Sequence, residues 1–317
     1  SEPTTDTKMA DRVDLLKKTP LAVLACYTTP KLITIPENAN VGKALQVLRD
    51  SNVYAAPVVT AENVPVGMVD LNDITQWLAT VLKGSEWNEE RKNHLRSHHN
   101  FEANSFFSKP VKEVINLSGQ DKLDAMSVDD QSLYDAITRL ASGTRRLPLV
   151  EDSEVLTVVS PSLFVRYLSE SITTPEFADV LKLTVGERPR KDVVSIQGSA
   201  MVAEALILMS TKGVSSCAIV DASGKLYSTF TLKDLRIVTN ARSFVKLFKT
   251  VDEYILDVRR RSARAIFPAI HCYTKDTLER VLLRMAAARI HRMFVLNEQH
   301  ELVDVISLRD IVTEFIK

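Results

Sequence analysis

Four short turns carry the residues best suited to chemistry, and each lies where a predicted strand is followed by a predicted helix. They are Asp70-Leu-Asn-Asp73, Ser160-Pro-Ser-Leu163, Thr231-Leu-Lys-Asp234 and Ser307-Leu-Arg-Asp310. Each begins with a residue that caps helices well, and three of the four place an aspartate three positions later. The free N–H groups of such a turn can bind an anion, while the carboxylate binds the two hydroxyl groups of a ribose.

The same spacing has a second explanation that needs no ligand. In a capping box, the acidic side chain accepts a hydrogen bond from the backbone N–H of the cap residue. A single copy would favour the capping box. The recurrence of Asp73, Asp234 and Asp310 at equivalent places favours the ribose site.

Basic residues directly precede the buried-looking strand that lies upstream of the second and fourth turns. They are Arg145, Arg146, His291 and Arg292. Guanidinium groups suit phosphate because they offer fixed, forked donors. Standing alone, these residues would be explained as surface charges or ion pairs. Because they alternate with Tyr54 and Ser215 in the other two units, we predict a paired phosphate clamp at the centre of the molecule.

These residues recur because the chain contains four copies of one unit, with the predicted order β-α-β-β-α. The clearest copy is the last, from Ile270 to Lys317, and the others begin at Leu32, Leu123 and Val193. Its first helix is amphipathic, with an apolar face formed by Leu278, Val281, Leu282 and Met285. A unit of about 50 residues cannot cover its own sheet, so we expect the copies to pair.

The predicted fold class is α/β, or α+β repeats, with the four units paired into two pseudo-symmetric modules that form a flattened disc. We expect an N-terminal tail over residues 1–30, repeats 1 and 2 over 31–185, and repeats 3 and 4 over 186–317. A polar, partly helical insertion at 83–122 interrupts the first pair. The stretch Gly186–Asp192 is the predicted linker between the halves.

Composition excludes several functional classes. The 40 basic residues balance 40 acidic ones, so no net field draws the chain to nucleic acid or to an anionic membrane. The three cysteines form no CxxC pair, and no apolar run approaches about 18 residues. We therefore expect buried thiols, no membrane segment and a cytoplasmic or nuclear location.

Catalytic and metal-binding patterns are weak. The sequence has no GxSxG, P-loop or GxGxxG motif, which argues against an enzyme. Glu90, His94 and His98 are spaced four apart on one predicted helix, with His99 beside them, but Glu90 and His98 lie about 12 Å apart along its axis, so these three cannot share one ion. A site formed by two histidines is the alternative to a solvated helix face, and we predict no metal.

The chain resembles the tetra-CBS-domain γ regulatory subunit of AMP-activated, or sucrose-nonfermenting-type, protein kinase. The resemblance runs from about Leu15 to Lys317. It is carried by Ile290-His291-Arg292, the Ser307-Leu-Arg-Asp310-Ile turn and HCYTKDTLE in the last copy, and by YAAPVV and GMVDLNDI in the first. It implies four CBS repeats that bind AMP, ADP or ATP between paired repeats, with no cofactor required.

The resemblance also implies roles for individual residues. Ribose would be bound by Asp73, Asp234 and Asp310. Phosphates would be bound by Arg146, Arg261, His291 and Arg292, and the position of Arg145 before the second repeat's middle strand adds it to this set. The nucleotide turns would include Thr231, Ser307, Arg309 and Ser215. The family's second repeat also lacks the acid, as Leu163 does here, which leaves one site ordinarily empty.

This chain departs from the family at several places. The family has a basic residue at Tyr54, a histidine at Arg145, a lysine near Ser162 or Leu163, and a proline at Ala218. The loss of two central cations weakens the shared phosphate site. Arg309 and Lys233, which lie inside the turns, are candidates to replace them.

The function implied by the resemblance is that of a non-catalytic, energy-sensing regulatory subunit of a heterotrimeric kinase. Its partners would be a catalytic α subunit and a scaffold β subunit, with no nucleic acid and no membrane. The segment Val13–Tyr27 resembles the family's β-contacting region, and a cap over the disc is the alternative. Tyr54 and Ser162 favour a different function: a stand-alone CBS scaffold or homodimer with degenerate sites or another adenosyl ligand.

Overall fold

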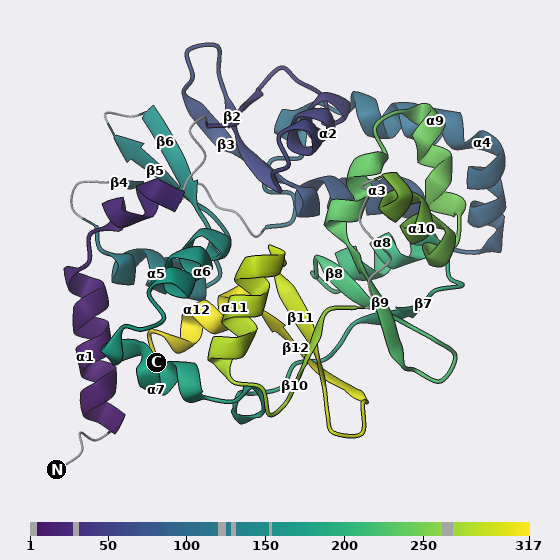
Figure 1. The fold of residues 1–317 in the computed structure, drawn as a ribbon. Helices are drawn as coiled ribbons and strands as arrows, with labels where there is room; N and C mark the ends of the chain where they lie inside the picture. Colours follow the sequence, from purple (N-terminus) through teal and green to yellow (C-terminus); the bar gives the residue numbers. More distant parts are fainter. Residues whose placement is uncertain (1–4, 28–31, 120–124, 128–130, 152–153, 262–268) are drawn as a thin grey trace. The chain divides into compact units, whose positions relative to one another are not determined.

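The computed structural model describes the chain except for residues 1–4, 28–31, 120–124, 128–130, 152–153 and 262–268 (Figure 1). Within the described residues lie four three-stranded sheets of one topology. In each sheet the first strand pairs parallel with the second, and the second pairs antiparallel with the third. The strands are β1 (Ile35–Pro36), β2 (Ala55–Val59) and β3 (Pro65–Asp70); β4 (Met126–Ser127), β5 (Leu147–Glu151) and β6 (Glu154–Val159); β7 (Ser195–Gln197), β8 (Ser216–Val220) and β9 (Leu226–Thr231); and β10 (His271–Tyr273), β11 (Arg292–Leu296) and β12 (Leu302–Ser307).

Each sheet carries two helical segments, so the predicted β-α-β-β-α order is confirmed in all four repeats. A helix must connect the first two strands because parallel neighbours need a crossover. These crossover helices are α2 (Val41–Asp50), α5 (Leu133–Ala141), α8 (Val202–Thr211) and α11 (Leu278–Ala288). The segments after the third strands are α3 (Leu71–Lys83), α6 (Pro161–Glu170), the 3-10 helix η5 (Leu232–Ile237) and α12 (Leu308–Glu314).

The last repeat shows why these sequences fold this way. The Thr277 hydroxyl accepts a hydrogen bond from the backbone N–H of Arg280 and so caps α11. The apolar face predicted for this helix, which includes Leu278 and Met285, is fully buried. Arg289 then takes a left-handed conformation, φ 51°, which ends the helix and turns the chain into β11.

The chain divides into two compact units, and each combines repeats from both halves of the sequence. The repeat-2/4 unit comprises residues 1–32, 123–192 and 271–317, and the repeat-1/3 unit comprises 33–122 and 193–270. Each unit has its own apolar core. In the repeat-2/4 unit α12 packs on α5 and α6, and in the repeat-1/3 unit α3 packs on α8.

The predicted division into 31–185 and 186–317 is therefore not the one that the compact units follow. The physical reason is that the apolar faces of α3 and α8, which include Leu78 and Met209, belong to one core. The pairing of repeat 1 with repeat 2 and of repeat 3 with repeat 4 stays a prediction. The stretch Gly186–Asp192 is also more than a linker, because it belongs to the repeat-2/4 unit and hydrogen-bonds to repeat 4: the Gly186 N–H donates to the Thr274 carbonyl at 2.7 Å.

The N-terminal segment is part of a core. It forms α1 (Thr5–Lys18) and the 3-10 helix η1 (Leu21–Tyr27), with Leu16 and Leu21 fully buried. Arg12 donates hydrogen bonds to the carbonyls of Phe315 and Lys317, at 3.1 and 2.6 Å, and pairs with Asp179 at 2.9 Å. Val13–Tyr27 was interpreted either as a region that contacts a β subunit or as a cap over the repeats. These contacts support the second interpretation.

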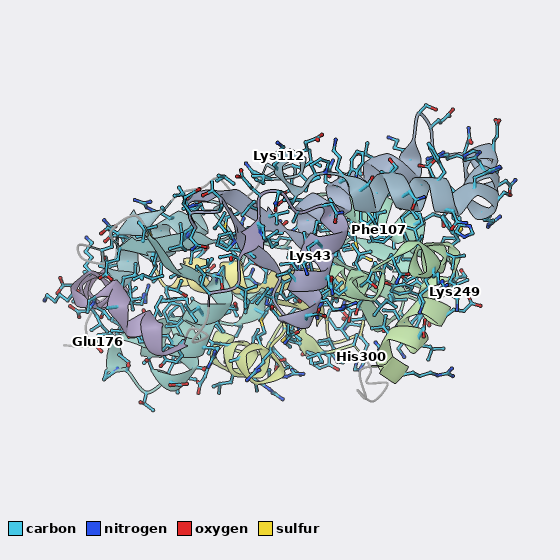
Figure 2. The ribbon with its side chains drawn as sticks, turned by 90° about the horizontal axis from the view of Figure 1, so that it is seen from above. Lys43, Phe107, Lys112, Glu176, Lys249 and His300 are labelled. Atoms are coloured by element: carbon cyan, nitrogen blue, oxygen red, sulfur yellow. The ribbon has the colours of Figure 1, made fainter. Side chains whose placement is uncertain are left out.

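The insertion at 83–122 belongs to the repeat-1/3 unit and is partly helical, as predicted. Its helix α4 (Glu89–Ser108) has a non-helical residue, His98, within it and is followed by η2 (Val111–Glu113). Arg91 donates hydrogen bonds to the Val81 and Leu82 carbonyls at the end of α3. Phe107, labelled in Figure 2, packs edge-on against Phe244 of α9 (Ala241–Phe244), with ring centroids 6.2 Å apart.

The remaining segments complete the two units. They are η3 (Pro175–Phe177), α7 (Ala178–Lys182), η4 (Val185–Glu187), η6 (Val245–Phe248) and α10 (Val251–Arg261). No helix in the described residues combines the length and the apolar character needed to span a membrane.

Candidate functional site

The three acidic turns are capping boxes. The backbone N–H of the cap residue donates to Oδ2 of the aspartate, at 2.9 Å from Asp70 to Asp73, 2.8 Å from Thr231 to Asp234, and 2.8 Å from Ser307 to Asp310. The capping-box interpretation is therefore confirmed for all three. Since these bonds reach only Oδ2, the surroundings of Oδ1 decide whether each carboxylate can also bind a ligand.

The second turn has no such box among the described residues. The Ser160 side chain accepts no hydrogen bond from a backbone N–H of its helix; instead, its hydroxyl lies 2.8 Å from the hydroxyl of Ser162. Pro161 occupies the first helical position, and Leu163 is buried where the other repeats have an aspartate. This turn offers no carboxylate to a ribose.

Each acidic turn is tied to the start of the middle strand in its own repeat. The backbone N–H of the first helical residue donates to the carbonyl of the residue before that strand. The pairs are Leu71 to Tyr54 at 3.1 Å, Leu232 to Ser215 at 3.1 Å, and Leu308 to His291 at 3.0 Å. In these three repeats, the start of the acidic turn and the residue before the middle strand thus lie side by side. In the second repeat this bond cannot form, because Pro161 has no N–H.

Asp73 is enclosed. Its Oδ1 accepts hydrogen bonds from the N–H and the hydroxyl of Ser118, at 2.9 and 2.7 Å. The residue is fully buried. Burial and the neighbouring Asp70 carboxylate raise the pKa of Asp73 to about 7, against the opposing effect of the Ser118 hydrogen bonds.

Asp310 is held by a basic residue from the stretch that joins the repeats. The ammonium group of Lys191 pairs with Oδ1 of Asp310, and the Ser307 hydroxyl donates to Oδ2 at 2.7 Å. Burial acts to raise the pKa of Asp310, but the hydrogen bond and charge of Lys191 and the Ser307 hydrogen bonds outweigh it and hold the pKa below its ordinary value. The Lys191 side chain is 48% exposed, so solvent reaches this partner of Asp310.

Arg188 is a second cation beside Asp310. Its guanidinium is buried, with Nη2 at 3.6 Å from Oδ2 of Asp310 and Nε at 3.8 Å from the Glu314 carboxylate. Within the described residues, Nε and Nη1 of Arg188 have no hydrogen-bond partner. The buried guanidinium therefore places a second positive charge beside the Asp310 carboxylate.

Asp234 is half-buried in the third repeat. The N–H and the hydroxyl of Thr231 both donate to Oδ2, at 2.8 Å each. Burial raises the pKa of Asp234, and the Thr231 hydrogen bonds and the charges of Arg259 and Arg236 oppose the rise. Two cations therefore act on this carboxylate from within its own unit.

Four of the five predicted phosphate residues belong to one unit, and the fifth, Arg261, belongs to the repeat-1/3 unit. Arg145 and Arg146 precede β5, His291 precedes β11, and Arg292 is the first residue of β11; all four are half-buried parts of the repeat-2/4 unit. Arg309 donates to the Gly143 carbonyl at 2.8 Å, which places it at the loop that leads to Arg145. Its role as a substitute cation stays a prediction. The phosphate role of all these residues stays a prediction.

The other predicted residues have mixed outcomes. Lys233 places its ammonium 5.4 Å from the ring centroid of Tyr54, and its role as a replacement cation stays a prediction. The Ser215 carbonyl accepts the hydrogen bond from the Leu232 N–H that is described above. Arg261 is the last residue of α10, and its side chain lies outside the described residues.

The structure describes the histidines of α4 and two of the three cysteines. The His94 and His98 rings stack with centroids 4.6 Å apart, and the described residues contain no group of three or more His, Cys, Asp or Glu side chains that could bind a metal ion. Cys217 and Cys272 are buried free thiols, and the side chain of Cys26 lies outside the description.

Three residues of the site were missed from the sequence. They are Ser118, Arg188 and Lys191. No local signal marks Ser118. The only sign of Arg188 and Lys191 was the basic character of the stretch Gly186–Asp192.

Comparison with known proteins identifies the repeats. The CBS domain family model matches residues 24–80, 185–238 and 263–317, which together exceed half of the chain. These matches correspond to repeats 1, 3 and 4, while the structure shows the same order of elements in repeat 2.

Curated fungal proteins are similar over most of this chain. Protein SDS23 of Kluyveromyces lactis is 24% identical over 347 residues, covering 98% of this chain and 65% of the relative. Protein sds23/moc1 of Schizosaccharomyces pombe is 24% identical, covering 84% and 66%. The chain thus spans about half to two thirds of the length of the curated relatives it matches.

Two solved structures share the fold. A Methanocaldococcus jannaschii protein, described as a proposed archaeal homologue of g-AMPK, superposes with a TM-score of 0.67 at 17% identity, covering 92% of this chain and 99% of its own. An uncharacterised conserved protein from Pyrococcus horikoshii superposes with a TM-score of 0.52 at 15% identity, covering 91% and 97%. At these identities the likeness concerns the fold alone.

Proposed function

The chain belongs to the CBS domain family, and from this we propose that it is a non-catalytic regulatory protein that binds an adenine nucleotide, AMP, ADP or ATP. The ribose would bind at the turns of Asp234 and Asp310. The observation that supports the proposal is the hydrogen bond from Leu308 to His291, because it joins the turn of Asp310, the proposed ribose acid, to His291, a proposed phosphate-binding residue of the same repeat.

The chemistry at Asp310 supports this proposal. The two ribose hydroxyls would replace Lys191 as donors to Oδ1, and the buried Arg188 guanidinium would keep the carboxylate ionised. The phosphates would then meet His291 and Arg292. Nucleotide charge state would act on the protein only through its different affinity for different conformations.

Titration calorimetry with AMP and ATP tests the proposal. Asp310→Asn and Asp234→Asn should each weaken binding by about tenfold or more, because each removes a charged acceptor for ribose hydroxyls. Asp135→Asn is the matched control. Asp135 also caps a helix, accepting at 2.9 Å from the Ser132 N–H, but it lies outside the predicted turns, so this variant should bind as the parent does. Equal affinity in all four proteins contradicts the proposal.

The partners proposed for the chain are the α and β subunits of a kinase, as the resemblance implies. A second candidate is a stand-alone sensor or homodimer. It is favoured by the burial of Leu16, Leu21 and Leu24, which places the supposed β-contacting segment in the core. Light scattering after size exclusion, with and without purified α and β subunits, distinguishes a heterotrimer from a self-associated or single species.

A further inference from the structure

The segment after α4 folds back onto the first repeat. The Val111 N–H donates to the Ala39 carbonyl at 2.9 Å, and the Asn116 N–H donates to the Met68 carbonyl of β3 at 3.3 Å. Val111 and Val114 are fully buried. The 83–122 insertion therefore ends in a segment that is fixed to repeat 1 by backbone bonds and apolar burial.

Gly67 allows this segment its close approach. A Cβ atom at Gly67 would lie 2.5 Å from Cγ2 of Ile115, a distance that such atoms do not adopt. Only glycine at this place in β3 leaves room for Ile115 to pack on the strand. The missing side chain of Gly67 therefore makes the space that Ile115 fills.

Ser118 satisfies the first repeat's carboxylate in the way that a ribose would. A ribose offers two hydroxyl donors to an aspartate; Ser118 offers its N–H and its hydroxyl, and both reach Oδ1 of Asp73. With the Asp70 N–H on Oδ2, both carboxylate oxygens are occupied. The cavity beside this turn, lined by Asn72, Ser118 and neighbouring residues, holds about 40 Å³. That volume admits a water molecule, whereas ligand pockets need about 300 Å³ or more.

We propose that Ser118 is an internal ligand of Asp73, and that residues 114–119 occupy the place which a ribose would take in the first repeat. The chain then binds nucleotide through Asp234 and Asp310 but not through Asp73. This inference rests on the proposed function and narrows it, because it assigns the insertion the role of closing one of the three acidic turns.

The contact at Asp310 differs from the contact at Asp73 in how easily the partner of the carboxylate can be displaced. Lys191 reaches Asp310 through a long side chain that is 48% exposed, so a ligand can displace it. Ser118 makes a bond through its own backbone, within a segment whose valines are buried. Displacing Ser118 requires the whole segment to leave the strand.

Calorimetry on single variants tests the inference. Asp73→Asn should leave the AMP stoichiometry unchanged and the Kd within about twofold of the parent, whereas Asp234→Asn and Asp310→Asn should each weaken binding by about tenfold or more. Loss of a binding site in Asp73→Asn, comparable to that in Asp310→Asn, overturns the inference.

A thermal unfolding cycle tests the contact without any nucleotide. Ser118→Ala should lower the Tm by about 2–4 °C in the parent and by less than about 1 °C in an Asp73→Ala background. Ser97→Ala is the control, since the Ser97 hydroxyl is exposed and bonds only within α4. Equal shifts in both backgrounds overturn the inference. If the parent binds no AMP, the proposed function fails, and this cycle still decides whether Ser118 occupies Asp73.

Discussion

The carbonyl oxygen of His291 accepts a 3.0 Å hydrogen bond from the backbone N–H of Leu308. Leu308 follows the cap residue of the Asp310 turn, and His291 directly precedes β11. One backbone bond thus fixes the spacing between a predicted ribose acid and a predicted phosphate residue. The second repeat has neither the bond nor the acid, because Pro161 and Leu163 stand at those positions.

The buried carboxylate of Asp73 predicts a pH dependence of stability. Its pKa is raised to about 7 in the folded chain, above the ordinary value of about 3.8, so the folded state binds the proton more tightly. The free energy of unfolding should therefore fall as pH rises from about 4 to about 7, and Asp73 should contribute no further change above that.

Urea unfolding of the parent and of Asp73→Asn between pH 5 and pH 8 checks this prediction. Asparagine keeps an oxygen acceptor for Ser118 but does not titrate, so the variant should lose stability less steeply over this range. Equal pH slopes in the two proteins would show that Asp73 titrates near its ordinary pKa.

The ion pair between Lys191 and Asp310 predicts a pH dependence of stability with the opposite sign. The pKa of Asp310 is lowered in the folded chain, so its stabilising effect is present above the ordinary pKa and is lost as pH falls through the folded value. Lys191→Met should raise the pKa of Asp310 and reduce the stability at pH 6 by about 0.5–1 kcal/mol, a modest effect because Lys191 is half exposed.

Carboxyl NMR titration of Asp310 in the two proteins measures this shift directly. Lys275→Met is a suitable control, because Lys275 forms an exposed ion pair with Glu298 away from the site. An unchanged Asp310 pKa in Lys191→Met would mean that Arg188 and the Ser307 hydrogen bonds hold the carboxylate without Lys191.

The contact between Gly67 and Ile115 predicts a pair of compensating substitutions. Gly67→Ala should destabilise the chain by about 1–3 kcal/mol, because the added Cβ overlaps Ile115. Ile115→Ala in the same chain should recover part of that loss by removing the overlapping methyl group. Chemical unfolding of both single variants and the double variant gives the coupling. Additive losses would contradict the close packing of the two residues.

The sequence was sufficient to predict the local structure. Periodic apolar residues such as Leu278 and Met285 define the helices, so the order of elements is confirmed. Cap residues such as Ser307 define the turns, where the capping box, the alternative to the ribose site, is present. These features depend on residues within one repeat, where spacing alone carries the information.

The partners of the aspartates and the grouping of the repeats depend on residues that are distant in the chain. Ser118 is 45 positions from Asp73, and Lys191 is 119 positions from Asp310, so no local pattern connects them. The grouping of repeats 1 with 3 and 2 with 4 was missed for the same reason. It depends on which apolar helix faces meet, as α3 and α8 do, and the repeats look alike in sequence.

The central claim is that the Asp310 turn binds the ribose of an adenine nucleotide. The most direct test is calorimetric titration of AMP into the parent, Asp310→Asn and the control Asp135→Asn. The account predicts binding to the parent and the control with equal Kd, and an affinity lower by about tenfold or more for Asp310→Asn. Binding that is unaffected by Asp310→Asn, or no AMP binding to the parent at all, would contradict the account and leave Asp310 as a helix cap only.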